Sequence, residues 1–131
     1  KIINLKKYNE DSTIALLGLS FKPNTDDMRE STSLKIANYF IERGIKINCY
    51  DPVCMDDANK IFPDLNYCKS PYDACKNADA IILGTEWNEF RALNFSKIKK
   101  KINIPIIFDL RNIYKSEELE KLGYLYYGIG K

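Results

Sequence analysis

Three short runs of residues in this chain are apolar at nearly every position, and they constrain the fold more than any other feature. The runs are residues 13–19 (TIALLGL), 80–84 (AIILG) and 104–109 (IPIIFD). A strand with one face in water alternates apolar and polar residues, whereas a strand covered on both faces is apolar throughout. The runs therefore predict buried parallel strands, and each run is far too short to span a membrane.

Helical patterns and weaker strand patterns separate these runs. Further strands are expected at residues 45–50, 65–68 and 124–129, and helices at residues 31–43, 54–62, 71–78, 88–93, 95–101 and 116–122. Gly44 and Gly123 follow two of the helices as stop signals, and Ser116 is the expected cap of the last helix. The alternation predicts an α/β fold, a Rossmann-like doubly wound, mostly parallel sheet with helices on both faces.

The chain has 131 residues and contains no histidine. That absence excludes Ser-His-Asp and Cys-His catalytic groups, histidine-ligated zinc or haem, and imidazole acid–base chemistry. The formal charge of +2 gives no argument for nucleic acid or an anionic membrane as a partner. We expect residues 12–131 to form one domain and residues 1–11 to be an arm or the end of a preceding helix. Because the chain begins with Lys1 rather than Met, we expect a piece of a longer protein.

The four cysteines, at positions 49, 54, 68 and 75, form no CxxC pair. This spacing argues against a zinc ribbon or a thioredoxin-like site. With no secretory signal in view, we expect reduced thiols in a cytoplasmic protein, and two disulfides are the alternative. No base that would activate a thiol is evident, so we expect neither a catalytic cysteine nor a metal site in this chain.

Ligands of open parallel sheets bind beyond the carboxyl ends of the strands, so the segments that follow the strands are the candidate site. The first segment, residues 20–31 (SFKPNTDDMRES), lacks the GxGxxG pattern that cradles a pyrophosphate. It offers two cations instead, Lys22 and Arg29, on either side of Asp26 and Asp27. The cations suit a phosphate. Alternatively, the two aspartates bias the start of the helix and Arg29 is an ordinary surface residue.

Asp51, Trp87 and Arg111 follow three of the other expected strands. Asp51 stands where a ribose-binding acid is often found, but it lies well beyond the usual ~20 residues from Gly18, which favours a role in a turn. Trp87 suits either stacking on a ligand or packing between a loop and a helix, which is the commoner use. Arg111 suits an anionic ligand, and a surface arginine paired with Asp109 is the alternative.

Four segments, taken in order, resemble the C-terminal, UDP-binding domain of the UDP-glucose/GDP-mannose dehydrogenase family. They are residues 18–31 (GLSFKPNTDDMRES), 50–52 (YDP), 70–90 (SPYDACKNADAIILGTEWNEF) and 108–114 (FDLRNIY). The TEW at residues 85–87 is most similar to the UDP-glucose 6-dehydrogenase branch. The resemblance implies the C-terminal domain of an NAD-dependent UDP-glucose 6-dehydrogenase, which oxidises UDP-glucose to UDP-glucuronate and reduces two NAD.

The resemblance also implies roles for single residues. Phe21 and Lys22 match family residues that contact the UDP-sugar, and Arg111, within a DLR segment, matches an arginine associated with that substrate. Arg29 matches a residue that reaches NAD, which the N-terminal domain of the family mainly binds. No residue of this chain is implied as catalytic.

The family's nucleophilic cysteine, glycine-rich NAD fingerprint and central dimer region lie upstream of the domain that this chain resembles. We therefore expect the chain to be inactive alone, with a UDP-sugar and the missing N-terminal and central domains as its partners. The full-length protein is expected to be a homodimer or larger, with no nucleic-acid or membrane partner. Two alternatives stay open: a dehydrogenase of another nucleotide sugar (GDP-mannose or UDP-N-acetylmannosamine), and a stand-alone, non-catalytic nucleotide-binding module.

Overall fold

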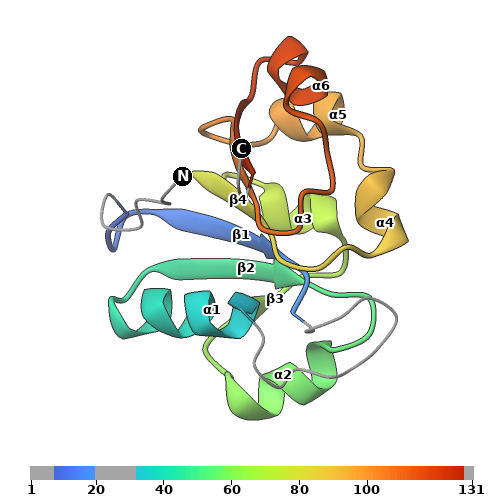
Figure 1. Ribbon diagram of the computed structural model, residues 1–131. Coiled ribbons are helices and arrows are strands. Elements are labelled where there is room, and N and C mark those ends of the chain that lie inside the picture. The colour runs from blue at the N-terminus through green and yellow to red at the C-terminus, as the bar shows by residue number, and fades with distance from the viewer. Residues whose placement is uncertain (1–7, 20–31, 129–131) are drawn as a thin grey trace.

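The computed structural model describes residues 8–19 and 32–128. Its strands form one sheet and are β1 (Thr13–Leu17), β2 (Lys46–Tyr50), β3 (Asn66–Tyr67), β4 (Ala80–Leu83), β5 (Ile106–Asp109) and β6 (Leu125–Gly128). Their order across the sheet is β3-β2-β1-β4-β5-β6, and every neighbouring pair is parallel. The predicted Rossmann-like α/β fold is confirmed, and the described sheet is parallel throughout (Figure 1).

Helices alternate with these strands, as the sequence predicts. They are α1 (Thr32–Glu42), α2 (Met55–Ile61), α3 (Pro71–Cys75), α4 (Asn88–Arg91), α5 (Phe95–Lys99) and α6 (Ser116–Lys121). Gly44 and Gly123 adopt φ angles of 73° and 93°, the left-handed conformation that ends a helix. The predicted cap at Ser116 is wrong, because Lys115 is the N-cap and Ser116 is already helical.

Within residues 8–19 and 32–128, no helix combines the length and apolar character needed to cross a lipid bilayer.

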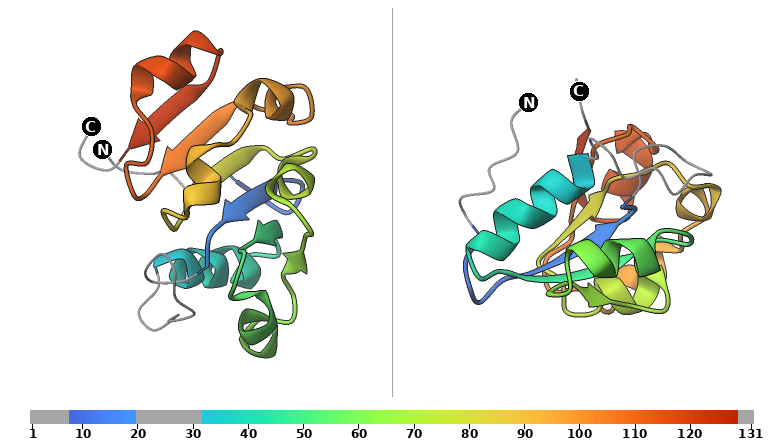
Figure 2. Two further views of the ribbon diagram at one scale, coloured as in Figure 1. Left: turned by 90° about the vertical axis from the view of Figure 1, so that its right-hand side faces the viewer. Right: turned by 90° about the horizontal axis from the view of Figure 1, so that it is seen from below.

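Two apolar cores lie on opposite faces of the sheet. One core receives Ala37 and Phe40 from α1 and Ala58 from α2, and the other receives residues of α3, α4, α5 and α6. Neighbouring residues of β4 enter different cores, since Ile82 belongs to the first and Ile81 to the second. Every position of β4 is buried, which explains why its sequence is apolar throughout. The right-hand view of Figure 2 shows α1 on one side of the sheet.

Successive strands along the chain extend the sheet first to one side of β1 and then, from β4 onward, to the other side. From β1 the sheet grows through β2 to β3, and from β4 it grows the opposite way through β5 to β6. The connections after β1 and β4 therefore diverge, and open α/β sheets bind ligands in the crevice at such a point. The arrowheads of β1 and β2 point to the right in Figure 1, and the other strands run parallel to them, so the left-hand view of Figure 2 looks onto this carboxyl edge.

Two glycines allow the backbone to pack closely at the carboxyl edge. A Cβ added to Gly84 would collide with Oγ of Ser33 and lie 2.8 Å from the carbonyl oxygen of Gly18. Gly18 has a φ of +97°, and a Cβ there would lie 2.6 Å from the backbone nitrogen of Thr85. The glycines thus bring the start of α1 against the ends of β1 and β4.

Candidate functional site

The carboxylate of Asp51 ties together three loops at the carboxyl edge. Its Oδ1 accepts hydrogen bonds from the backbone N–H groups of Val53 (2.8 Å) and Cys54 (2.9 Å). Its Oδ2 accepts hydrogen bonds from the backbone N–H of Leu19 (2.8 Å) and from the indole Nε1 of Trp87 (3.1 Å). Asp51 is fully buried, so these donors replace the water that the carboxylate loses on folding.

This geometry decides between the interpretations of Asp51 and Trp87. The role of Asp51 in a turn is confirmed, because Oδ1 bridges the two residues that open the connection to α2. Trp87 is 6% exposed and belongs to one of the two cores, so its use is packing. The described residues do not fit NAD at this edge, because Asp51 is buried and occupied and the sequence after β1 lacks the three-glycine pattern.

Asp109, at the end of β5, is the second buried carboxylate of this edge. Its Oδ1 accepts a hydrogen bond from the backbone N–H of Arg111 (3.1 Å). Its Oδ2 accepts one from the backbone N–H of Tyr114 (3.0 Å) and one from the hydroxyl of Tyr126 (2.7 Å). Burial, together with the hydrogen bond to Asp109, raises the pKa of the Tyr126 hydroxyl, which keeps it a donor. Asp109 therefore fixes the backbone of the loop that carries Arg111.

The guanidinium of Arg111 lies near a carboxylate from the neighbouring strand end. Its Nη2 is 3.8 Å from Oε1 of Glu86, and the side chain is 31% exposed. Oε2 of the same Glu86 accepts a hydrogen bond of 3.1 Å from Nη2 of Arg91. The suggested pairing of the Arg111 side chain with Asp109 is wrong, since Asp109 receives the backbone N–H of Arg111 and Glu86 pairs with its guanidinium.

The other three residues expected to bind ligands are Phe21, Lys22 and Arg29, and they lie outside the described residues. Arg111 is the member of the expected set that the structure places. It places Arg111 at the carboxyl edge, as a residue two positions beyond the end of β5. This edge is where a parallel sheet gathers its ligand contacts.

The four cysteines are free thiols, as predicted. Burial, with smaller effects of Cys68 and Asp51, raises the pKa of the Cys49 thiol to about 12. Burial also raises the pKa of Cys75 to about 12 and that of Cys68, which is half-buried. A catalytic cysteine requires a lowered pKa, so these thiols suit packing rather than nucleophilic attack. The described residues contain no cluster of acidic and cysteine side chains that could hold a metal ion.

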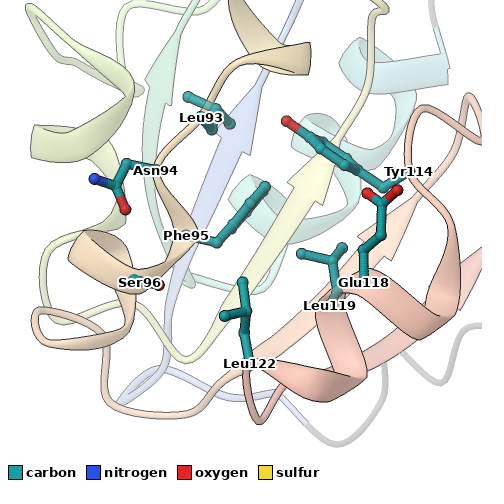
Figure 3. A pocket seen from close by; sticks show the side chains of 8 residues that line it. All are labelled: Leu93, Asn94, Phe95, Ser96, Tyr114, Glu118, Leu119 and Leu122. Atoms are coloured by element: carbon teal, nitrogen blue, oxygen red, sulfur yellow. The ribbon is translucent and has the colours of Figure 1, made fainter.

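A hollow of about 280 Å³ lies between α5 and α6 (Figure 3). Its walls are Leu93, Asn94, Phe95, Ser96, Tyr114, Glu118, Leu119 and Leu122. Glu118 is the one charged residue among them, and its carboxylate would repel a phosphate. This hollow therefore does not suit an anionic ligand, whereas the edge that carries Arg111 does.

Sequence reasoning missed the carboxylate between two arginines. In the sequence, Glu86 stands out only as part of the TEW segment, and Arg91 lies inside the helix predicted at residues 88–93. Glu86 and Arg91 are five residues apart. Side chains on one helix meet at spacings of three or four, so this spacing does not predict an ion pair. The partnership with Arg111 depends on β4 and β5 being neighbours, which the residue pattern alone does not specify.

Comparison with known proteins gives a consistent family signal. The family model described as the UDP binding domain of the UDP-glucose/GDP-mannose dehydrogenase family matches residues 15–116. The chain is 45% identical over 120 residues to a UDP-glucose 6-dehydrogenase of Rhizobium meliloti (strain 1021). The aligned region covers 92% of this chain and 28% of that relative.

Solved structures agree with this signal. A UDP-glucose dehydrogenase from the hyperthermophilic archaeon Pyrobaculum islandicum matches with a TM-score of 0.73 and 28% identity, over 89% of this chain and 25% of that chain. A UDP-D-ManNAc dehydrogenase from Pyrococcus horikoshii matches with a TM-score of 0.72 and 30% identity, over 92% of this chain and 26% of that chain. The chain thus spans roughly a quarter of the length of the proteins it matches.

Proposed function

The chain belongs to the UDP-glucose/GDP-mannose dehydrogenase family, in which it corresponds to the UDP-binding domain, and on this premise we propose that its carboxyl edge binds the UDP part of a UDP-sugar. The observation that carries the proposal is the position of Arg111. Its backbone is fixed by Asp109, while its guanidinium is 31% exposed at the carboxyl edge and engaged by Glu86 only at 3.8 Å. A guanidinium so placed suits a diphosphate.

The contribution of this domain to the reaction is positioning and charge neutralisation. Arg111 holds one end of the diphosphate, and Lys22 and Phe21, by their match to the family, contact the UDP-sugar from the connection after β1. These contacts fix the sugar relative to catalytic groups that the rest of a longer protein supplies. The buried thiols of Cys49 and Cys75, whose pKa values are raised, take no part in covalent chemistry.

NAD belongs to the proposed longer enzyme, where it would accept the hydride. The described residues of this chain do not fit it, so its binding is assigned mainly to the N-terminal domain, with Arg29 reaching it from this domain. We propose that residues 12–131 are the nucleotide-sugar-binding domain and that residues 1–11 lead into it. The full-length protein would be a cytoplasmic homodimer or larger oligomer, and the chain alone would be inactive.

The sugar that the full-length protein oxidises is proposed to be UDP-glucose. The similarity to the Rhizobium meliloti UDP-glucose 6-dehydrogenase supports this assignment. A UDP-N-acetylhexosamine is the second candidate, because the UDP-D-ManNAc dehydrogenase has a nearly equal TM-score, 0.72 against 0.73.

The test is a comparison of substrates in the full-length protein that carries this chain. Reduction of NAD is followed by absorbance with UDP-glucose, UDP-N-acetylmannosamine and GDP-mannose in parallel. We expect turnover with UDP-glucose at the highest kcat/KM, and none from this chain alone. Turnover with GDP-mannose only would overturn the UDP assignment, and preference for UDP-N-acetylmannosamine would transfer the protein to the second candidate.

A further inference from the structure

Glu86 is placed between two arginines, with one carboxylate oxygen directed to each. Oε2 accepts a hydrogen bond from Arg91 at 3.1 Å, and Oε1 lies 3.8 Å from Nη2 of Arg111. The first distance is that of a hydrogen bond, whereas the second is that of a loose ion pair. The carboxylate is therefore held mainly by Arg91, and its hold on Arg111 is weak.

The three side chains come from segments whose relative positions the fold fixes. Glu86 follows β4, Arg91 ends α4, and Arg111 follows β5. β4 and β5 are hydrogen-bonded neighbours in which Leu83 pairs with Asp109. Glu86 follows Leu83 by three residues and Arg111 follows Asp109 by two, so the two side chains come from loops that leave adjacent strands at the same edge of the sheet.

All three side chains remain accessible to water. The side chains of Arg111 and Glu86 are 31% and 34% exposed, and that of Arg91 is 50% exposed. An incoming anion can therefore reach the Arg111 guanidinium without a rearrangement of the core. In solvent such pairs contribute little to stability, so the interaction can be broken at small cost.

We propose that Glu86 is an internal competitor of the ligand's phosphate for Arg111, and that Arg91 sets the strength of this competition by drawing the carboxylate away. This inference rests on the proposed function of Arg111. Glu86 and Arg91 are positioning residues, which act on the ligand only through the Arg111 guanidinium. When the diphosphate binds, Arg111 exchanges Glu86 for a phosphate oxygen, and Arg91 retains the carboxylate.

The proposal predicts opposite effects of two neighbouring substitutions. Glu86→Gln removes the competing charge and tightens the binding of UDP by about threefold, the size expected for an exposed ion pair. Arg91→Gln frees the carboxylate to approach Arg111 and weakens the binding of UDP by a similar factor. In the double variant the carboxylate is absent, so its affinity equals that of Glu86→Gln alone.

The experiment is calorimetric titration of the full-length protein with UDP, at low salt and again at high salt. Glu89→Gln is the matched control, because Glu89 lies on α4 together with Arg91 and accepts its hydrogen bond from the hydroxyl of Tyr50 rather than from an arginine. Uridine is the uncharged probe. We expect its affinity to be equal in all variants, and the effects on UDP to shrink as salt screens them.

The outcomes separate two claims, which are the competition of Glu86 for Arg111 and the binding of UDP by Arg111. Weaker or unchanged UDP binding in Glu86→Gln overturns the competition, as does an effect of Arg91→Gln that persists in the double variant. Equal changes in uridine affinity also overturn it, because they indicate a structural cause. If the wild-type protein binds UDP and Arg111→Gln does not, the proposed function stands whatever Glu86→Gln shows. If Arg111→Gln binds UDP as the wild type does, the proposed function fails and the competition fails with it.

Discussion

The carboxylate of Asp51 accepts a hydrogen bond of 3.1 Å from the indole nitrogen of Trp87. Asp51 follows β2 and Trp87 follows β4, and these two strands flank β1. The same carboxylate oxygen accepts the backbone N–H of Leu19, just beyond β1. One buried carboxylate thus joins the ends of three adjacent strands at the edge where we place the ligand.

Replacing Asp51 with Asn is expected to destabilise the fold. The amide keeps the shape of the side chain but turns one acceptor into a donor that faces N–H groups, and it removes the charge that strengthens the remaining bonds. We expect a loss of about 2–3 kcal/mol in the free energy of unfolding. Urea denaturation followed by the fluorescence of Trp87 measures it.

Asp64→Asn is the matched control for Asp51→Asn, because Asp64 is exposed in a turn. A surface change of this kind is expected to stay within about 0.5 kcal/mol. Equal stability of the Asp51→Asn variant and the wild type would show that the carboxylate does not organise the edge.

Gly84 is expected to tolerate no side chain while Ser33 is present. A Cβ at Gly84 meets Oγ of Ser33 and lies 2.8 Å from the Gly18 carbonyl oxygen. Gly84→Ala should therefore lower the free energy of unfolding by about 1–3 kcal/mol through overpacking. Within the described residues, Oγ of Ser33 is buried without a hydrogen-bond partner, so Ser33→Ala alone should be nearly neutral or stabilising.

The double variant Gly84→Ala/Ser33→Ala tests this contact directly. Removing Oγ relieves the worst collision, so the double variant should be more stable than Gly84→Ala alone. Thermal denaturation of the four proteins forms a complete cycle. Additive effects of the two substitutions would mean that the residues do not meet.

The thiols are expected to differ in their accessibility to a thiol reagent. Cys49, Cys54 and Cys75 are 0% exposed, whereas Cys68 is half-buried. With a disulfide reagent at pH 8 and no denaturant, at most one thiol per chain should react readily, and peptide mapping should identify Cys68. All four should react in guanidinium chloride. Rapid native labelling of Cys75 would contradict the packing described for α3.

Stability is expected to fall on the alkaline side. The pKa of Cys75 rises from 9.0 to about 12 on folding, because burial disfavours the thiolate. Above pH 9 the unfolded chain loses this proton while the folded chain keeps it, so the free energy of unfolding declines until about pH 12. One such group contributes a slope of about 1.4 kcal/mol per pH unit. Cys49 adds to this slope, since burial raises its pKa to about 12 as well.

Urea denaturation at pH 8, 9, 10 and 11 measures the alkaline decline. The stability that the protonated thiols contribute is fully present below pH 9. In that range the thiols therefore give the free energy of unfolding no dependence on pH. The Cys75→Ala variant should show a shallower decline than the wild type, whatever its stability at pH 8. Parallel curves for the two proteins would contradict the assignment of the decline to this thiol.

Much of the fold follows from local sequence signals. The continuous apolar runs predict β1, β4 and β5, because strands covered on both faces need no polar positions. Gly44 and Gly123 predict the helix ends, because their φ angles of 73° and 93° favour glycine. The predicted cap of α6 lies one residue too late, since Ser116 is compatible with both the cap and the first turn.

The site is less predictable, because its contacts join residues that are distant in the sequence. The hydrogen bond from Trp87 to Asp51 and the pair of Glu86 with Arg111 each require the strand order of the sheet. A residue pattern gives the class of sheet, but the order of strands arises from the packing of the whole chain. The place of Arg111 after an apolar run predicts its position at the carboxyl edge, and this signal is local.

The central claim is that Arg111 binds the diphosphate of a UDP-sugar, and titration of this chain with UDP tests it most directly. Wild type, Arg111→Gln and Lys22→Ala are compared by calorimetry at low and high salt. The account predicts binding that weakens with salt and that falls by about tenfold or more in Arg111→Gln, the loss expected for a charge-assisted hydrogen bond. Undiminished UDP binding in Arg111→Gln would contradict it.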